Sequence, residues 1–330
     1  MKRRVFPLAL ASAAALLCSP LVATLAQAQP SAYPNQPIRV IVTFPPGGSA
    51  DAIVRMLVPK LNESLGQSVI VDNRPGAGGN IGMQLLSKAA PDGYTLGVGA
   101  AGALAANKSL YTNMPFDPEK DLTPVGMLAG IPFVLVGNPA VPAKNFQQLM
   151  ELSKQRPGQI SIAHGGNGTA MHLSTALLQQ MAGTKMVEVP YKGSGPAALD
   201  TLSGQVQLAI VDLPAALQQI KAGKLTAYAV TSPQRLAQLP DIPTVSEAGL
   251  KGYDSTGWFG VVAPTGTPAK AISRFNEAMV QALKDPQIQQ AMRSMGVEPA
   301  PDSPQAFGSY IQSESRKWAQ VIKQGNIKLD

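Results

Sequence analysis

The stretch "IRVIVTFPPGGSADAIVR", residues 38–55, joins an apolar run rich in β-branched residues to a helical pattern within a few positions. Such a run is typical of a strand buried on both faces of a parallel sheet. The two prolines that follow lack N–H groups, and Gly47 and Gly48 let another molecule approach the main chain. Ser49 and Asp51 then open a helix whose first amides have no intrahelical acceptor. The stretch predicts a strand–turn–helix unit that is either an anion receptor or an ordinary capped turn.

The same alternation of strand and helix continues along the chain. Further apolar runs include "SVIVD", "ISIA", "VQLAIVD" and "GWFGVVAP", and amphipathic segments stand between most of them. Strands that alternate with helices predict an α/β fold. The number of strands exceeds what one small sheet holds, so we expect two doubly wound α/β lobes with a ligand cleft between them. The expected lobes are residues 33–131 plus 256–330, and residues 132–255, with chain crossings near Ile131 and Ser255.

The first 28 residues have the pattern of an export signal. A basic "MKRR" precedes an apolar stretch, and "AQA" ending at Ala28 offers a signal-peptidase site. Without this segment and its Cys18, the chain has no cysteine and keeps 24 basic against 20 acidic side chains, a net charge of +4. We therefore expect an exported protein without disulfides, cleaved near Ala28, through either the Sec or the twin-arginine route. The small, evenly spread charge argues against a nucleic-acid partner.

Two further turns repeat the design of residues 44–51, and a later strand ends in an acidic residue. "AHGGNGTAMH" (163–172) leads from a strand through glycines to Thr169, which is expected to cap the next helix. "PYKGSGPAALD" (190–200) does the same with Lys192, and Asp212 ends a strand where a ligand hydroxyl or ammonium could lie. Two readings stay open for His164, a ligand donor or a satisfied loop histidine, and Asp212 is equally a buried helix cap.

Other functional classes find little support. "DNRPGAGGNIG" lacks the third glycine of a dinucleotide fingerprint and the lysine of a P-loop. Two histidines without a cysteine or an H-E-x-x-H motif make a catalytic zinc improbable, and no G-x-S-x-G elbow is present. The expectation is a protein that is not an enzyme and needs no metal or cofactor.

Ordered blocks from about Tyr33 to the C-terminus resemble the Bug family of periplasmic solute-binding proteins, which serve tripartite tricarboxylate transporters. The matching blocks are "YPNQPIRVIVTFPPGGSAD", "VDNRPGAGGNIG", "APDGYTL", "GGNGTAMHL", "VPYKGSGPAALDTLSGQV", "AGKLTAYAVTSPQRLAQLPDIPTVSEAGL" and "GWFGVVAPTGTPA". The resemblance implies a type II-like periplasmic binding protein that closes over a small carboxylate, held by main-chain amides, hydroxyls and water. His164 departs from the small residue that many relatives carry there.

From the motifs and the resemblance together we predict a monomeric periplasmic receptor whose partners are the carboxylate and the membrane subunits of the transporter. The predicted ligand-binding residues are Phe44, Pro46, Gly47, Gly48, Ser49, Asp51, His164, Gly165, Asn167, Gly168, Thr169, Tyr191, Lys192, Gly193 and Asp212. Two alternatives share the cleft. One is a ligand sensor that presents its carboxylate to a membrane histidine kinase, and the other is a periplasmic hydrolase. The sequence does not name the carboxylate.

Overall fold

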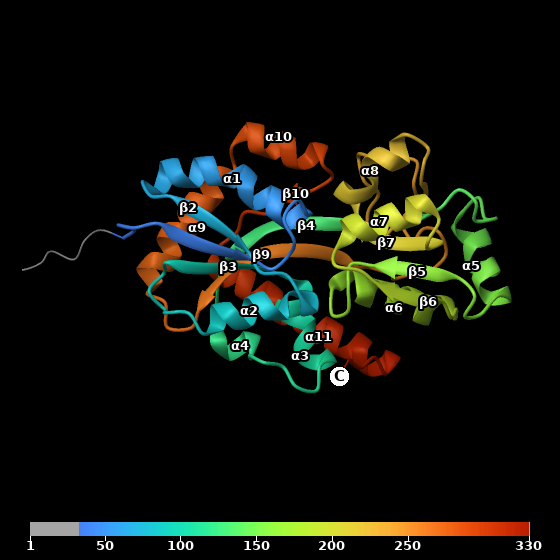
Figure 1. The fold of residues 1–330 in the computed structure, drawn as a ribbon, viewed down its shortest axis with the longest axis horizontal. Coiled ribbons are helices and arrows are strands. Elements are labelled where there is room, and N and C mark those ends of the chain that lie inside the picture. Colours follow the sequence, from blue (N-terminus) through green and yellow to red (C-terminus); the bar gives the residue numbers. More distant parts are fainter. Residues whose placement is uncertain (1–32, 330) are drawn as a thin grey trace, which may run out of the picture. The chain divides into compact units, whose positions relative to one another are not determined.

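Strand β4 (Leu122–Gly137), sixteen residues long, runs through the middle of the sheet (Figure 1). The structure is a computed structural model that describes residues 33–329. The first part of β4 pairs antiparallel with β9 (Thr256–Pro264). The last five residues pair antiparallel with β7 (Leu208–Asp212), and four of them also pair with β8 (Thr226–Val230). One strand therefore takes part in both ends of the sheet.

The sheet has the strand order β2-β1-β3-β9-β4-β7-β5-β6, and β8 and β10 both pair with β4. Parallel pairs occur at each end, β1 with β2 and β3, and β5 with β6 and β7. The pairs of β9 with β3 and β4 are antiparallel. The predicted α/β class is confirmed, and the sheet is mixed because β4 and β9 run against their neighbours. The other strands are β1 (Ile38–Val42), β2 (Val69–Asn73), β3 (Thr95–Ala100), β5 (Ser161–His164), β6 (Val187–Pro190) and β10 (Glu298–Pro299).

Helices cover both faces of this sheet. Those of the first half and the C-terminal part are α1 (Ser49–Leu65), α2 (Asn80–Ser87), α3 (Asn107–Leu110), α4 (Pro118–Asp121), α9 (Ala269–Leu283), α10 (Pro286–Ser294) and α11 (Pro304–Gly325). The middle of the chain supplies α5 (Phe146–Gln155), α6 (Ala170–Ala182), α7 (Ser194–Ser203) and α8 (Leu213–Lys221). Two short segments are the 3-10 turn η1 (Ala77–Gly79) and the π-helical η2 (Gly102–Ala106).

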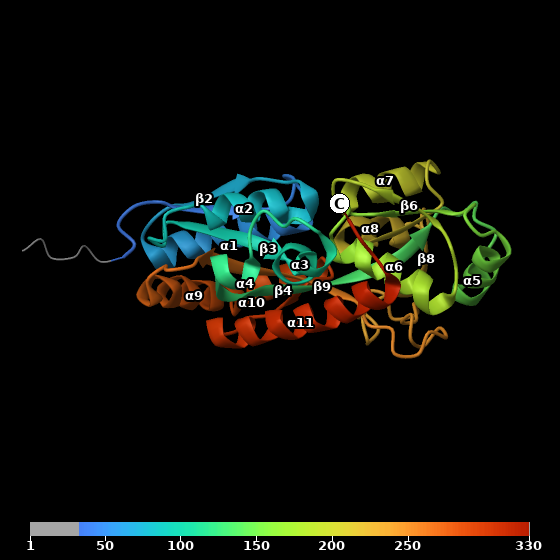
Figure 2. The same ribbon diagram turned by 90° about the horizontal axis from the view of Figure 1, so that it is seen from below.

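Helix α11 extends along one side of the molecule from α9 and α10 to α6 (Figure 2). Its buried Trp318 and Ile322 form one cluster with Leu110 of α3 and Leu173 of α6. The Trp318 and Trp258 ring N–H groups both donate to Glu314 Oε2, at 3.0 and 3.2 Å. The C-terminal helix thus packs against segments from both halves of the sheet.

The predicted cap at Thr169 is confirmed, and the other helix ends are closed in different ways. Thr169, Asp285 and Ser303 accept from first-turn amides as N-caps, and Gly66 ends α1 in the left-handed conformation. Ser49 is not a cap, because α1 is preceded by Gly48 without a side-chain cap bond. Asn80 and Thr267 are not N-caps either, because Gly79 and Pro268 occupy the N-cap positions of α2 and α9. The Asn80 side chain instead accepts from Asn107 Nδ2 at 2.8 Å.

Residues 33–330 group as one compact unit, so the division into lobes near Ile131 and Ser255 stays a prediction. Both expected crossings lie where β4 and β9 pair, at Ile131 with Gly257 and at Pro132 with Thr256. Within the described residues, no helix combines the length and the hydrophobicity needed to span a bilayer. The predicted signal segment and its cleavage position lie outside the described residues.

Candidate functional site

A cavity of about 760 Å³ lies where four helices begin. Its wall includes the first residues of α1, α6, α7 and α8, namely residues 47–50, 169–171, 193–196 and 212, 214 and 215. These helices have 17, 13, 10 and 9 residues. The amides of a first helical turn have no intrahelical acceptor, and the helix dipole places partial positive charge there. The cavity is therefore polarised to receive negative charge.

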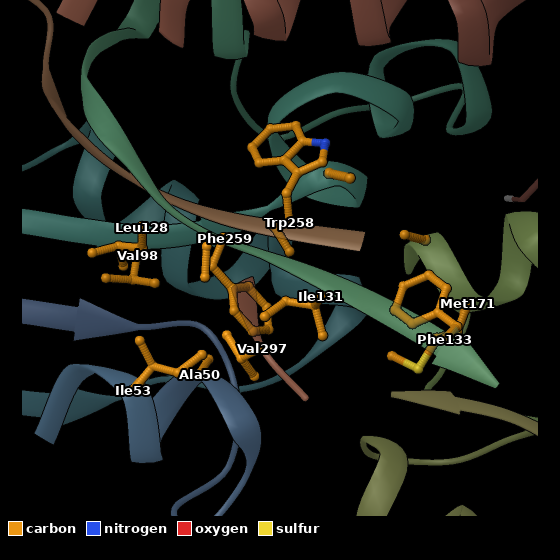
Figure 3. Close-up of a cluster of buried hydrophobic side chains, with 14 of the residues drawn as sticks. Ala50, Ile53, Val98, Leu128, Ile131, Phe133, Met171, Trp258, Phe259 and Val297 are labelled. Atoms are coloured by element: carbon orange, nitrogen blue, oxygen red, sulfur yellow. The ribbon is translucent and has the colours of Figure 1, made fainter. Parts of the chain in front are cut away.

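The rest of the wall is apolar. Phe44 follows β1, Phe133 lies on β4, and Phe259 lies on β9; the rings of Phe44 and Phe259 are 5.5 Å apart. Figure 3 shows Phe133 beside Met171, and Trp258 and Phe259 pointing to opposite sides of β9. Apolar walls with a few polar groups at one place are typical of small-molecule sites.

Only three charged side chains line this wall among the described residues, and they are Lys192, Asp200 and Asp212. Lys192 is exposed, and Asp200 accepts a hydrogen bond from the Tyr191 hydroxyl at 2.7 Å. This hydrogen bond to Asp200 raises the pKa of Tyr191 to about 12. No buried cation lines the cavity within residues 33–329. Binding of an anion would therefore rest mainly on amides and hydroxyls.

Asp212 and Ser49 form a link across the cavity. The Ser49 hydroxyl donates to Asp212 Oδ2 at 2.7 Å, and Asp212 lies 163 positions further along the chain. Asp212 is 6% exposed, and its Oδ1 atom has no hydrogen-bond partner among the described residues. Burial raises the pKa of Asp212, although the hydrogen bond from Ser49 opposes that shift. A buried carboxylate without a cation thus stands at the end of α8.

Asp51 holds the turn in front of α1. Its Oδ2 accepts from the Gly47 amide at 2.9 Å, and its Oδ1 accepts from Arg55 and Asn73. Burial would raise the pKa of Asp51, but these hydrogen bonds outweigh it and lower the pKa. The Gly47 amide is therefore already bonded, while Ser49 and Ala50 begin the helix with amides that lack an intrahelical acceptor.

His164 lies at the end of β5 and is fully buried. Its Nδ1 accepts from the Gly166 amide at 3.2 Å, and its Nε2 lies 3.6 Å from Glu188 Oε2. His172 is arranged in the same way, with Nδ1 toward the Gly168 amide at 3.4 Å and Nε2 at 3.4 Å from the same oxygen. The pKa of His164 is lowered to about 4. Burial is the main cause, and the electrostatic effect of His172 is the second. The pair supports the loop of residues 165–168 from behind.

The ligand atoms of His164, His172 and Glu188 lie within 4.8 Å of one another, a spacing that a metal ion could bridge. The hydrogen bonds that the two Nδ1 atoms accept from Gly166 and Gly168 argue against metal binding. A neutral imidazole whose Nδ1 accepts an amide hydrogen carries its own hydrogen on Nε2. Both Nε2 atoms therefore direct N–H groups, not lone pairs, toward Glu188. A metal at Nε2 would break the bonds that hold Gly166 and Gly168.

The structure brings part of the predicted set together. The cavity wall contains Phe44, Pro46, Gly47, Gly48, Ser49, Thr169, Lys192, Gly193 and Asp212. The wall does not contain Asp51, His164, Gly165, Asn167, Gly168 or Tyr191. His164 is the clearest of these, because its ring is enclosed between His172 and Glu188.

The loop of residues 166–168 also contacts η1 and η2 of the first half of the chain. A Cβ atom at Gly78 would lie 2.7 Å from the Asn167 carbonyl oxygen, and one at Gly102 would overlap the Gly168 carbonyl oxygen. Only glycine allows these backbones to approach so closely. The contact places the α6 turn beside the first half of the chain and next to the cavity.

Sequence reasoning missed most of the apolar wall and the first residues of α8. The apolar residues come from four distant segments, and each has an ordinary core pattern in the sequence: Ile131 and Phe133 on β4, Leu199 on α7, Trp258 and Phe259 on β9, and Met295 at the end of α10. Pro214 was a usable signal, because proline favours the first turn of a helix and so marked a helix end after the strand that finishes at Asp212.

The model of the family described as "Tripartite tricarboxylate transporter family receptor" matches residues 53–327. The chain belongs to this receptor family. It is 40% identical to protein BugT of Bordetella pertussis (strain Tohama I / ATCC BAA-589 / NCTC 13251) over 298 residues, which cover 90% of this chain and 91% of BugT. The predicted Bug-type resemblance is confirmed, and the protein is a solute-binding receptor of a periplasmic family.

Solved structures of similar proteins share the fold. The periplasmic binding protein BugD is 34% identical, with a TM-score of 0.85 over 90% of this chain and 99% of BugD. Rpa4515 of R. palustris, solved with adipate, is 35% identical, with a TM-score of 0.86 over 90% and 99%. MatC from Rhodopseudomonas palustris, solved with bound malate, is 30% identical, with a TM-score of 0.83 over 88% and 100%.

Proposed function

We propose that this receptor is exported to the periplasm, where it binds a small carboxylate in the cavity and delivers it to the membrane subunits of a tripartite tricarboxylate-type transporter. The observation that carries the proposal is the convergence of four helix N-termini on one cavity that, within residues 33–329, no buried cation lines. Each such terminus stabilises a nearby anion by about 0.3–2 kcal/mol. The similarity to receptors solved with adipate and malate supports a carboxylate as the anion.

The apolar part of the cavity wall favours a ligand with a hydrophobic carbon skeleton. Phe44, Phe133 and Phe259 would pack against a carbon skeleton, while the carboxylate faces the helix ends. The mature protein should be tested by titration calorimetry against mono-, di- and tricarboxylates of increasing chain length, with the corresponding amides as controls. Binding of acids but not amides is expected. A folded protein that binds none of the acids would refute the proposal.

The relative weight of Ser49 and Lys192 gives a testable prediction. A hydrogen bond to a charged group contributes about 1.5–3 kcal/mol, whereas an exposed ion pair contributes about 0–1 kcal/mol. The Ser49 hydroxyl donates to Asp212 in the unliganded structure and would turn to the ligand carboxylate on binding. Replacement Ser49→Ala should therefore lower carboxylate affinity by about tenfold or more, and Lys192→Gln by less than about fivefold. Calorimetry of the two variants side by side measures the difference.

The melting curve of each unliganded variant serves as the control for folding. If Lys192→Gln lowered carboxylate affinity more than Ser49→Ala did, a surface charge rather than helix ends and hydroxyls would dominate binding.

A further inference from the structure

We propose that carboxylate binding at this site is coupled to uptake of one proton by Asp212. The inference rests on the proposed function and states how the site accepts a second carboxylate beside its own. A buried carboxyl group at a site built for anions is the observation that needs explaining. Nothing else in the cavity wall offers a comparable charge conflict.

The geometry sets the two carboxylates side by side. Asp212 lies at the N-terminus of α8, and its Oδ2 atom is 2.7 Å from the Ser49 hydroxyl at the N-terminus of α1. A ligand oxygen bound by the first turn of α1 would therefore lie close to Oδ2. Two carboxylates that share one low-dielectric site do not both stay ionised, because their repulsion raises one pKa strongly.

Apart from the partial charge of the α8 N-terminus, the described surroundings of Asp212 offer no positively charged side chain. No Lys, Arg or His nitrogen among residues 33–329 lies within 4 Å of the Asp212 carboxylate. Its neighbour on β4 is Phe133, and the Ser194 hydroxyl at the start of α7 accepts from the Asp212 amide at 3.1 Å. The Ser194 hydroxyl itself points to Met171 Sδ at 3.0 Å.

The other titratable groups around the cavity are engaged or exposed. On α1, Asp51 pairs with Arg55, and on α7, Asp200 accepts from Tyr191. Lys192, in the loop before α7, is exposed to solvent, which screens its charge. Beyond the β5 end, His164 and His172 face Glu188 rather than Asp212. A proton is therefore the simplest way to remove the conflict.

The proton also completes the hydrogen bonding. Asp212 Oδ1 has no partner, and Oδ2 accepts from Ser49. A protonated carboxyl group has one O–H donor, which can be directed at the ligand carboxylate. An acid in the solvent, a hydronium ion or the protonated buffer, gives up the proton, so its own bond to that proton breaks as the Asp212 O–H bond forms. The ligand then gains a donor at the place where an ionised Asp212 would repel it.

Titration calorimetry at pH 8 in buffers of different ionisation enthalpy tests the proposal with the carboxylate that binds best in the panel. The wild-type protein should take up close to one proton per ligand bound. By linkage, its affinity should fall by up to tenfold for each pH unit where uptake is complete. Because simple carboxylic acids are fully ionised above about pH 6, the ligand itself contributes no proton change there.

The variant Asp212→Asn keeps the shape of the side chain and supplies an N–H donor without titrating. It should bind the same carboxylate with no proton uptake, with affinity independent of pH between 6 and 8, and at least as tightly as the wild type at pH 8. The control Asp241→Asn removes an exposed carboxylate outside the cavity wall and should keep the proton uptake of the wild type.

Each outcome separates this inference from the proposed function. Tight wild-type binding without proton uptake would overturn the coupling but leave carboxylate binding intact. Loss of binding in a folded Asp212→Asn variant at every pH would also overturn it, because Asp212 would then serve a ligand cation as an ionised partner. Failure of every carboxylate to bind the wild type would refute both proposals.

Discussion

Replacement Gly102→Ala should lower carboxylate affinity by about tenfold to 100-fold. The added Cβ atom would overlap the Gly168 carbonyl oxygen, and a backbone atom cannot turn aside as a flexible side chain can. The loop of residues 166–168 must then move away from η2, and it carries with it the Thr169 end of α6 that lines the cavity. Overpacking of this kind typically costs about 1–3 kcal/mol.

Calorimetry with the best-binding carboxylate measures this effect, and the melting temperature of the unliganded variant measures how much of it is global destabilisation. Gly130→Ala is the matched control, because a Cβ atom there meets nothing within 4 Å and its φ is not in the left-handed region. Unchanged affinity in Gly102→Ala would show that the contact between η2 and the loop does not shape the binding site.

The stability of the protein should fall by about 3 kcal/mol between pH 6.5 and pH 4 through His164 alone. Burial lowers the pKa of its imidazole from 6.5 to about 4 in the folded protein. Below pH 6.5 the unfolded chain binds a proton at this position that the folded protein does not. The free energy of unfolding therefore decreases as the pH falls. The full stability is present above pH 6.5, and the loss is complete near pH 4.

His164→Asn isolates this contribution, because an Asn oxygen can accept from the Gly166 amide but does not titrate. Denaturant unfolding of both proteins at half-unit steps should give a steeper decline for the wild type, with a maximal difference in slope of about 1.4 kcal/mol per pH unit. Glu188 and other carboxylates titrate in both proteins, so they largely cancel in the difference. Parallel curves would mean that His164 protonates without penalty in the folded state.

Local sequence patterns predicted the elements that local physics controls. The run of residues 38–42 forms a strand, the glycine-rich turns lead into helices, and Thr169 caps α6 as expected. In each of these cases the partners of a residue lie within a few positions along the chain. The cavity-wall residues Gly48, Thr169 and Gly193 could be predicted for that reason, since a helix start after a strand is a local pattern.

The sequence by itself determined the α/β class, the receptor family and the glycine-rich turns that lead from strands into helices, because strand and helix periodicity and helix ends depend on neighbours in sequence. The tertiary structure decided that Ser49 bonds Asp212 rather than capping α1, that His164 is enclosed behind the loop, and that β4 joins both ends of the sheet. These features join residues far apart in the chain, such as Ser49 and Asp212 at 163 positions. Which distant groups meet depends on the packing of the whole core.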